Sequence, residues 1–189
     1  MPQSNTTRFF KFSSINSPEF STGVAFTYNL IGGLLRYSAL PDSNYAIYDL
    51  LPIEVEYVPG TWRVNDMPFP GFPDPHFEEI PNWNGTGRTM LRFIWDDAHG
   101  NNFTLQPGVD FFQRFVIQFR ARIRNGVPPG TVVENCNGLF SAEQRTNYNA
   151  QDVLDLDEDG DTDEIYGREC DQIIAVSYTH LTLPTTPYV

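Results

Sequence analysis

The sequence predicts an all-β fold, an antiparallel β-sandwich of about seven to nine strands. Two observations support this prediction. The chain of 189 residues contains 14 Gly and 15 Pro, a composition that favours frequent turns over long helices. Several short segments alternate apolar and polar residues, as half-buried strands do. No segment has a convincing helical pattern, and a hydrophobic content of 40% is sufficient for the core of one domain.

The longest strand is expected at Phe111–Arg124. Its expected inward residues are Phe111, Phe115, Ile117, Phe119, Ala121 and Ile123. The opposite side carries Arg114, Arg120, Arg122 and Arg124. A helix would scatter these arginines around its surface, so the period of two is favoured. The arginine-rich side is most simply a solvated face, and a site for a polyanion is the alternative.

Shorter strands are expected on both sides of this segment. They are Arg8–Phe12, Val24–Ile31, Tyr45–Asp49, Glu54–Val58, Thr61–Val64, Thr89–Trp95, Thr131–Val133 and Gln172–Ala175. Asp49 is expected at a strand end, where its carboxylate would accept backbone N–H bonds in a turn.

Two long connections interrupt this pattern, Asn65–Gly87 and Ser141–Glu169. Long loops are uncommon in compact domains and often carry function. The first connection contains Phe69, Phe72, Phe77 and Trp83 among several prolines. These aromatic residues either cap one end of the sandwich or form a ligand-binding surface.

Charge and motif content exclude several functional classes. The net charge of -12 argues against nucleic-acid binding, because phosphates would be repelled. No apolar run approaches the roughly 18 to 20 residues that a membrane-spanning helix needs. No nucleophile elbow, zinc-ligand spacing or phosphate-binding loop is present, so the chain is not expected to be an enzyme.

The last fourteen residues, Val176–Val189, differ from the rest of the chain. They contain no Asp, Glu, Lys or Arg, and VSYTHLTLPTT reads as the translation of a transposase sequencing adapter. We therefore expect residues 1–175 to form a single native domain within a fragment of a longer protein, and residues 176–189 to be an artefact.

Four stretches resemble a known family in their order and spacing. They are GVAFTYNL, IYDLLPIEVEYVPGTW, LQPGVDFFQRFVIQFRARI and GVPPGTVVENC. Together they make residues 20–140 similar to the bacterial surface conserved-repeat domain, an Ig-like module related to fimbrial isopeptide-forming domains. Ile53 and Glu54 depart from the family pattern, which has a small residue and Gly after the proline.

The resemblance implies an extracellular or cell-surface location and a non-catalytic role. The module would serve as a repeat or stalk, with neighbouring domains of the same longer chain as its partners. The alternative is an adhesin module that binds a host or matrix ligand through the aromatic loop Asn65–Gly87.

In that extracellular context, Cys136 and Cys170 are expected to form a disulfide. The bond would close a loop of about 35 residues and contribute roughly 3 to 4 kcal/mol to stability. Two free buried thiols in a cytosolic chain are the alternative.

The segment between the cysteines contains DLDEDGDTDE, which suggests a calcium loop. Alternate carboxylates can converge on a hard cation while Gly160 permits a sharp turn. The expected Ca²⁺ ligands are Asp155, Asp157, Asp159, Asp161 and Asp163. Tyr166 occupies the position where an EF-hand loop has glutamate, so the loop resembles shorter calcium loops of thrombospondin-type repeats. The alternative is a solvated acidic loop.

The relation to fimbrial domains also suggests an intramolecular isopeptide bond. Lys11 is the single lysine and lies on the first expected strand, whereas Asn135 lies on a late strand. Asp49 would shuttle the proton, with Glu54 as another candidate. An ordinary exposed lysine is the alternative.

Overall fold

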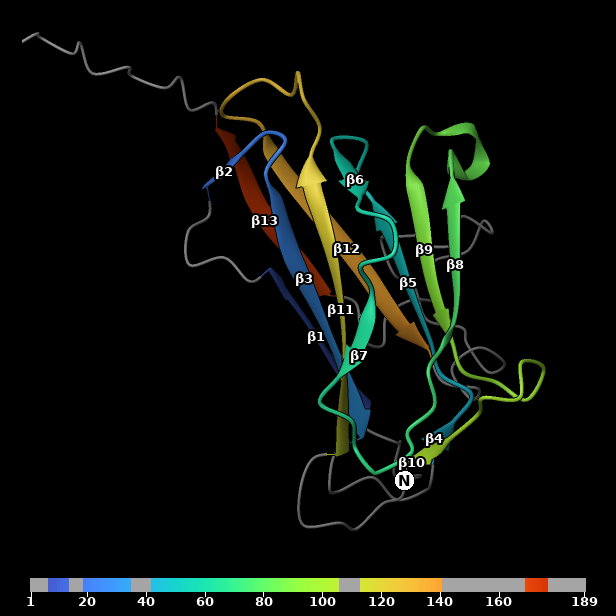
Figure 1. Ribbon diagram of the computed structural model, residues 1–189. Coiled ribbons are helices and arrows are strands. Elements are labelled where there is room, and N and C mark those ends of the chain that lie inside the picture. The colour runs from blue at the N-terminus through green and yellow to red at the C-terminus, as the bar shows by residue number, and fades with distance from the viewer. Residues whose placement is uncertain (1–6, 14–18, 35–41, 106–112, 141–168, 177–189) are drawn as a thin grey trace, which may run out of the picture.

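The computed structural model describes residues 7–13, 19–34, 42–105, 113–140 and 169–176. These residues form two packed β-sheets, so the predicted all-β sandwich is confirmed (Figure 1). The first sheet has five strands: β1 (Thr7–Ser13), β3 (Ala25–Leu34), β11 (Gln113–Ile123), β6 (Val55–Tyr57) and β7 (Arg63–Asn65). The second has six: β2 (Glu19–Ser21), β13 (Glu169–Val176), β12 (Val132–Phe140), β5 (Ala46–Leu51), β9 (Thr89–Ile94) and β8 (His76–Pro81).

Pairing is antiparallel throughout except between β13 and β2, which run parallel. A separate two-stranded ladder joins β4 (Asp42–Ser43) to β10 (Thr104–Leu105). A short 3₁₀ turn, η1 (Trp83–Gly85), joins β8 to β9. No helix in the described part of the chain is long and apolar enough to cross a membrane.

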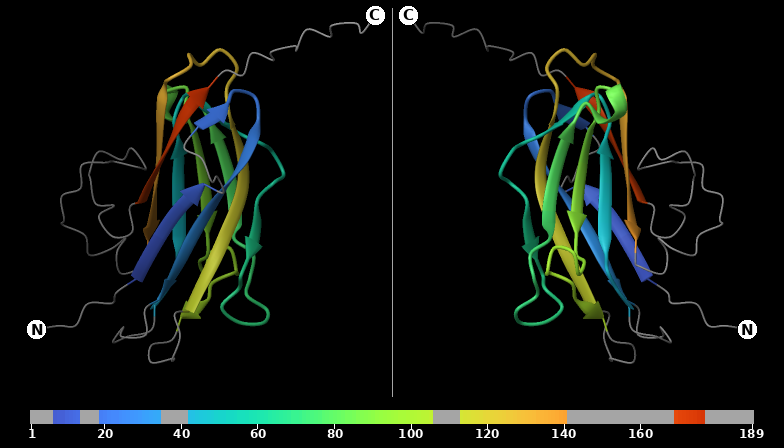
Figure 2. Two further views of the ribbon diagram at one scale, coloured as in Figure 1. Left: turned by 90° about the vertical axis from the view of Figure 1, so that its left-hand side faces the viewer. Right: turned by 90° about the vertical axis from the view of Figure 1, so that its right-hand side faces the viewer.

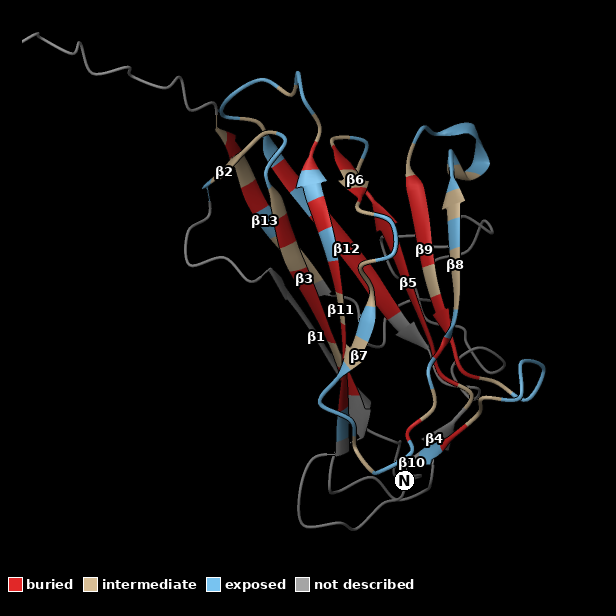
Figure 3. Cartoon of the chain, viewed as in Figure 1, coloured by how far each residue is buried: buried red, intermediate tan, exposed pale blue. Residues whose placement is uncertain are grey.

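The core between the sheets follows the predicted alternation of β11. Its side chains Phe115, Ile117, Phe119, Ala121 and Ile123 are fully buried. Figure 3 shows the resulting alternation of buried and exposed positions along this strand. Gly32 on β3 lies opposite Phe115, and a Cβ at Gly32 would stand only 2.6 Å from the phenylalanine ring. Glycine at this position therefore lets the tip of the ring approach the backbone of the neighbouring strand closely.

A second apolar cluster lies on the outer side of the six-stranded sheet. It contains Ala46, Tyr48, Leu50, Met90, Ile94 and Cys136, all buried. On β5 these residues alternate with Ile47 and Leu51, which belong to the core between the sheets. The guanidinium of Arg92 lies 4.5 Å from the ring centre of Tyr48 and 5.7 Å from that of Trp83. The strand β5 is consequently buried on both faces, and Asp49 is the only charged residue in it.

Several sequence expectations are corrected by these elements. The connection Asn65–Gly87 is not one long loop, because it contains β8, an edge strand that ends at Pro81. Proline lacks a backbone donor and is tolerated at such an edge. Strand β12 continues to Phe140, well past the expected Val133. Strands β2, β4 and β10 were not predicted, because two or three residues are too few to show periodicity.

Candidate functional site

The disulfide predicted from the sequence is present. Cys136 on β12 and Cys170 on β13 stand directly opposite each other, with their Cα atoms 4.1 Å apart. Both side chains pack with the outer apolar cluster, away from the core between the sheets. The bond spans 34 positions of sequence and fastens β12 to β13 near the start of β13.

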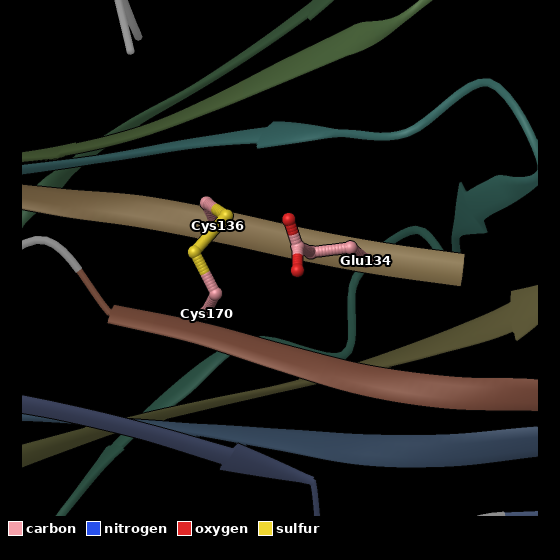
Figure 4. A group of neighbouring side chains, drawn as sticks. All are labelled: Glu134, Cys136 and Cys170. Carbon is pink, nitrogen blue, oxygen red and sulfur yellow. A yellow bond between two sulfur atoms is a disulfide. The ribbon is translucent and has the colours of Figure 1, made fainter. Parts of the chain in front are cut away.

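Glu134 lies beside the two sulfurs, as Figure 4 shows. A carboxylate near two cysteines can indicate a metal site. Here the two sulfurs are bonded to each other and so are not thiolate ligands. The Glu134 carboxylate instead accepts a hydrogen bond of 2.5 Å from the Gln172 side chain on β13. We interpret this group as a structural crosslink rather than a metal centre.

A cluster of polar residues is buried inside the sandwich. Asp49, Asn135 and Asn137 are all fully buried, and they lie on the adjacent strands β5 and β12. Asn137 stands directly opposite Asp49 in the register. Burying polar side chains costs free energy unless they are hydrogen-bonded, and burying a charge costs more. Such a cluster is therefore unusual in a core that is otherwise aromatic and aliphatic.

Tyr28 of β3 faces this cluster from the opposite sheet. Burial raises the pKa of its phenol well above the ordinary value. The negative charges of Asp49 and Asp171 raise that pKa further, while the nearby side-chain amide of Asn135 opposes the rise. These couplings place the phenol, the two carboxylates and the amide in one electrostatic environment that bridges the sheets.

The structure brings two of the three predicted isopeptide residues together. Asp49 is not at a strand end, as the sequence suggested, but in the middle of β5 with its side chain directed into the core. Asn135 lies on β12, the strand next to β5. Lys11 lies on β1, opposite Leu30, and β1 contacts both β12 and β13. The side chain of Lys11 is outside the described part of the structure.

The aromatic residues of the Asn65–Gly87 connection are packed into the protein. Phe72 is buried and lies 4.5 Å from Phe103 and 5.5 Å from Phe115, measured between ring centres. Phe69 and Phe77 pack against the core between the sheets, and Trp83 packs against the outer cluster. This packing agrees with the capping role and gives the adhesin alternative no support.

The predicted calcium ligands Asp155, Asp157, Asp159, Asp161 and Asp163 lie outside the described residues, as do residues 177–189 of the suggested adapter. Sequence reasoning missed Tyr28 and Asn137 in the buried polar cluster, and the half-buried Asp171 whose charge acts on Tyr28. The alternation Val133, Asn135, Asn137 was the available signal, because it places two amides on the same side of a strand as a buried valine.

The comparisons with known proteins concern the fold. The sequence matches no known family model and no curated protein. A variant of BcpA, the major pilin subunit of Bacillus cereus, matches the structure with a TM-score of 0.50 and 10% identity. The match covers 92% of this chain and 41% of that one. The Corynebacterium diphtheriae major pilin SpaA matches with a TM-score of 0.49 and 14% identity, over 89% of this chain and 37% of that one.

This chain thus spans less than half the length of these two pilins. At these identities the similarity is one of fold. The protein is an Ig-like β-sandwich of the kind found in a bacterial major pilin subunit.

Proposed function

We propose that this chain is a non-catalytic structural module of a secreted or cell-surface bacterial protein, as the BcpA pilin subunit is of a pilus. The observation that carries the proposal is the direction of the first and last described strands, β1 and β13. Strand β1 starts near one end of the sandwich and β13 finishes at the other, as Figures 1 and 2 show. A module placed in series along a linear stalk needs its chain to enter and leave at opposite ends.

This arrangement also suits a load-bearing role. Tension applied across the module acts along β1 and β13, and β1 is held by seven residue pairs to β3. Inter-strand hydrogen bonds lie perpendicular to antiparallel strands. A pull along the strands therefore loads all of these bonds in shear at once, whereas a pull across a strand end breaks them one at a time.

Single-molecule pulling tests the proposal. In the first geometry the chain is pulled from its two termini, and in the matched control it is pulled between Thr22 and Asn125. These positions flank the paired ends of β3 and β11, so the control separates the two strands from one end. We expect a clearly higher unfolding force in the first geometry. Equal or lower force along the termini would contradict a load-bearing role.

The same measurement reports on the disulfide. With the bond intact, the 34 positions between the cysteines do not contribute to the extension on unfolding. Reduction should add about 110 Å of contour length, at roughly 3.3 Å per residue.

We further propose that Lys11 and Asn135 form an intramolecular isopeptide bond. The Lys11 amine would attack the amide carbon of Asn135, the new C–N bond would replace the old one, and ammonia would leave. Asp49 would carry the proton between the two groups. The full burial of Asp49 and Asn135 on adjacent strands supports this proposal, because a dry site favours an uncharged amine as nucleophile.

Intact-mass measurement tests this bond. We expect a mass lower than the sequence mass by one ammonia, in addition to the loss of two hydrogens at the disulfide. Lys11→Ala and Asn135→Ala should abolish the ammonia loss, whereas Asn137→Ala, the matched buried amide, should retain it. An unmodified mass in the original chain would remove the proposal.

For the acidic segment, we propose Ca²⁺ binding by Asp155, Asp157, Asp159, Asp161 and Asp163. The support is the alternate spacing of carboxylates around Gly160 and the concentration of negative charge. Calcium titration with thermal melting tests it. We expect a higher melting temperature with Ca²⁺ than with EDTA, and no such difference after Asp157→Asn with Asp159→Asn.

A further inference from the structure

Five arginines gather on the outer side of the five-stranded sheet. They are Arg63 of β7, Arg114, Arg120 and Arg122 of β11, and Arg124 directly after β11. We call this surface the arginine face. It holds five of the twelve basic residues of a chain whose net charge is -12. The inward residues of β11 are buried in the core, so alternation directs its arginines to the outer side.

The carboxylates on this surface only partly neutralise it. Glu56 pairs with Arg122 and with Arg124, and Asp66 pairs with Arg114 at 2.5 Å. Two carboxylates thus pair with three of the five guanidinium groups among the described residues.

Two of the arginines have no acidic partner within the described part of the chain. The Arg63 guanidinium donates to the neutral side chain of Gln118 at 2.9 Å. The Arg120 guanidinium is exposed and makes no hydrogen bond or ion pair with another described residue. The arginine face therefore presents guanidinium groups that are free to bind carboxylates from outside.

The same chain contains a segment of opposite charge. Residues 152–168 hold eight Asp and Glu residues and one Arg. The segment is bracketed by β12 and β13, which belong to the six-stranded sheet, whereas the arginine face lies on the other sheet (Figure 1). The two charged regions thus start from opposite layers of the sandwich. This separation favours contact between two copies over contact within one.

We propose that the arginine face docks the acidic segment 152–168 of a second copy of this chain. Guanidinium groups bind carboxylates through charge-assisted, often paired, hydrogen bonds. Each exposed pair contributes little, so the contact is weak, additive over several pairs and sensitive to salt. Copies held in series would dock more strongly, because linkage raises their effective concentration. The proposal does not depend on the pilus-type function or on calcium.

Two complementary variants test it by sedimentation velocity in EDTA at low salt. The first, Arg63→Glu with Arg120→Glu, reverses the charge of the two arginines without an acidic partner and keeps the acidic segment. The second carries Asp→Asn at positions 155, 157, 159, 161 and 163 and keeps the arginine face. We expect the unchanged chain to self-associate, each variant alone to be monomeric, and their mixture to form a 1:1 complex. Raising the salt from about 50 to about 500 mM should weaken association by about tenfold or more.

Matched controls separate docking from misfolding. Arg63→Lys with Arg120→Lys keeps the charge and should keep most of the association, and all variants should retain the melting curve of the unchanged chain. If the variants form a mixed complex but the unchanged chain stays monomeric, the segment docks within its own copy and the proposal is overturned. A mixture that remains monomeric overturns it as well, including the case in which the face binds a sulfated glycan instead.

Discussion

The two sheets of the sandwich share one core but present very different outer faces. The five-stranded sheet exposes the arginine face, whose ion pairs are on the surface and partly screened by water. The six-stranded sheet carries the outer apolar cluster, in which Ala46, Leu50 and Met90 have at most 1% of their surface exposed. Of the two faces, it is this second one that bears the disulfide.

The difference between the two outer faces indicates where the stability of the sandwich is concentrated. Apolar burial stabilises in proportion to the area removed from water, whereas exposed ion pairs contribute about 1 kcal/mol or less each. Substitutions on the six-stranded sheet should therefore be far more destabilising than substitutions on the arginine face, which is left free to interact. Four experiments test whether the two sheets contribute differently to stability.

The largest effect is expected from removing the crosslink. Replacing both Cys136 and Cys170 with Ser should lower the free energy of unfolding by about 3 to 4 kcal/mol, because the unfolded chain regains the entropy of a 34-position loop. Urea titration of the two proteins under non-reducing conditions measures this difference. Adding a reductant should bring the original chain to the stability of the variant, and equal midpoints without reductant would show that the bond contributes nothing.

A cavity on the outer side of the six-stranded sheet should lower the free energy of unfolding nearly as much as loss of the disulfide does. Met90→Ala removes a completely buried side chain and should lower the free energy of unfolding by about 3 kcal/mol. Val132→Ala is the control, because Val132 is on the same sheet but 59% exposed, and it should change stability by less than about 0.5 kcal/mol. Similar small losses for both would mean that the outer cluster is not a core.

The inner faces also differ, since the six-stranded sheet directs Asp49 toward Tyr28. The raised pKa means that the folded state keeps its phenol proton after the unfolded state has lost it. Above about pH 10, stability should therefore fall as pH rises, by up to about 1.4 kcal/mol per pH unit from this group. Denaturant titrations from about pH 9 to about pH 11 should show a shallower decline for Tyr28→Phe, and parallel declines would disprove the assignment.

The smallest effect is expected on the arginine face itself. Arg122→Ala breaks an exposed ion pair with Glu56 and should change the free energy of unfolding by less than about 1 kcal/mol. The change should shrink further in about 500 mM salt, because the pair is screened. If Arg122→Ala lowered the free energy of unfolding as much as Met90→Ala does, the two faces would not differ in their contribution to stability.

Much of the fold could be predicted from local patterning. The alternation through β11 identified both its buried and its arginine-bearing side, because a strand with one face in water has a clear period of two. The same rule failed for β5. Its residues are buried on both faces and have no clear period of two, so the sequence suggests that the strand ends at Asp49, although it continues to Leu51. Strand β8 was hidden by neighbouring prolines that are typical of loops.

The candidate sites also differ in how far the sequence could predict them. The disulfide needed only two cysteines and an extracellular context, and the structure contains it. The cluster of Asp49, Asn135 and Tyr28 depends on packing between strands distant in sequence, so no local pattern could assemble it. The register between β5 and β12, which places Asn137 opposite Asp49, likewise requires the sheet topology.

The position of Cys136 opposite Cys170 has a consequence for proteolysis of the chain. Any single cut between the two cysteines yields two polypeptides that remain covalently joined through the sulfurs. Strands β12 and β13 would keep their register, since their six residue pairs lie at the bridge or close beside it. A protease could thus open the acidic segment without severing the module, and only a reductant acting afterwards would release the C-terminal strand.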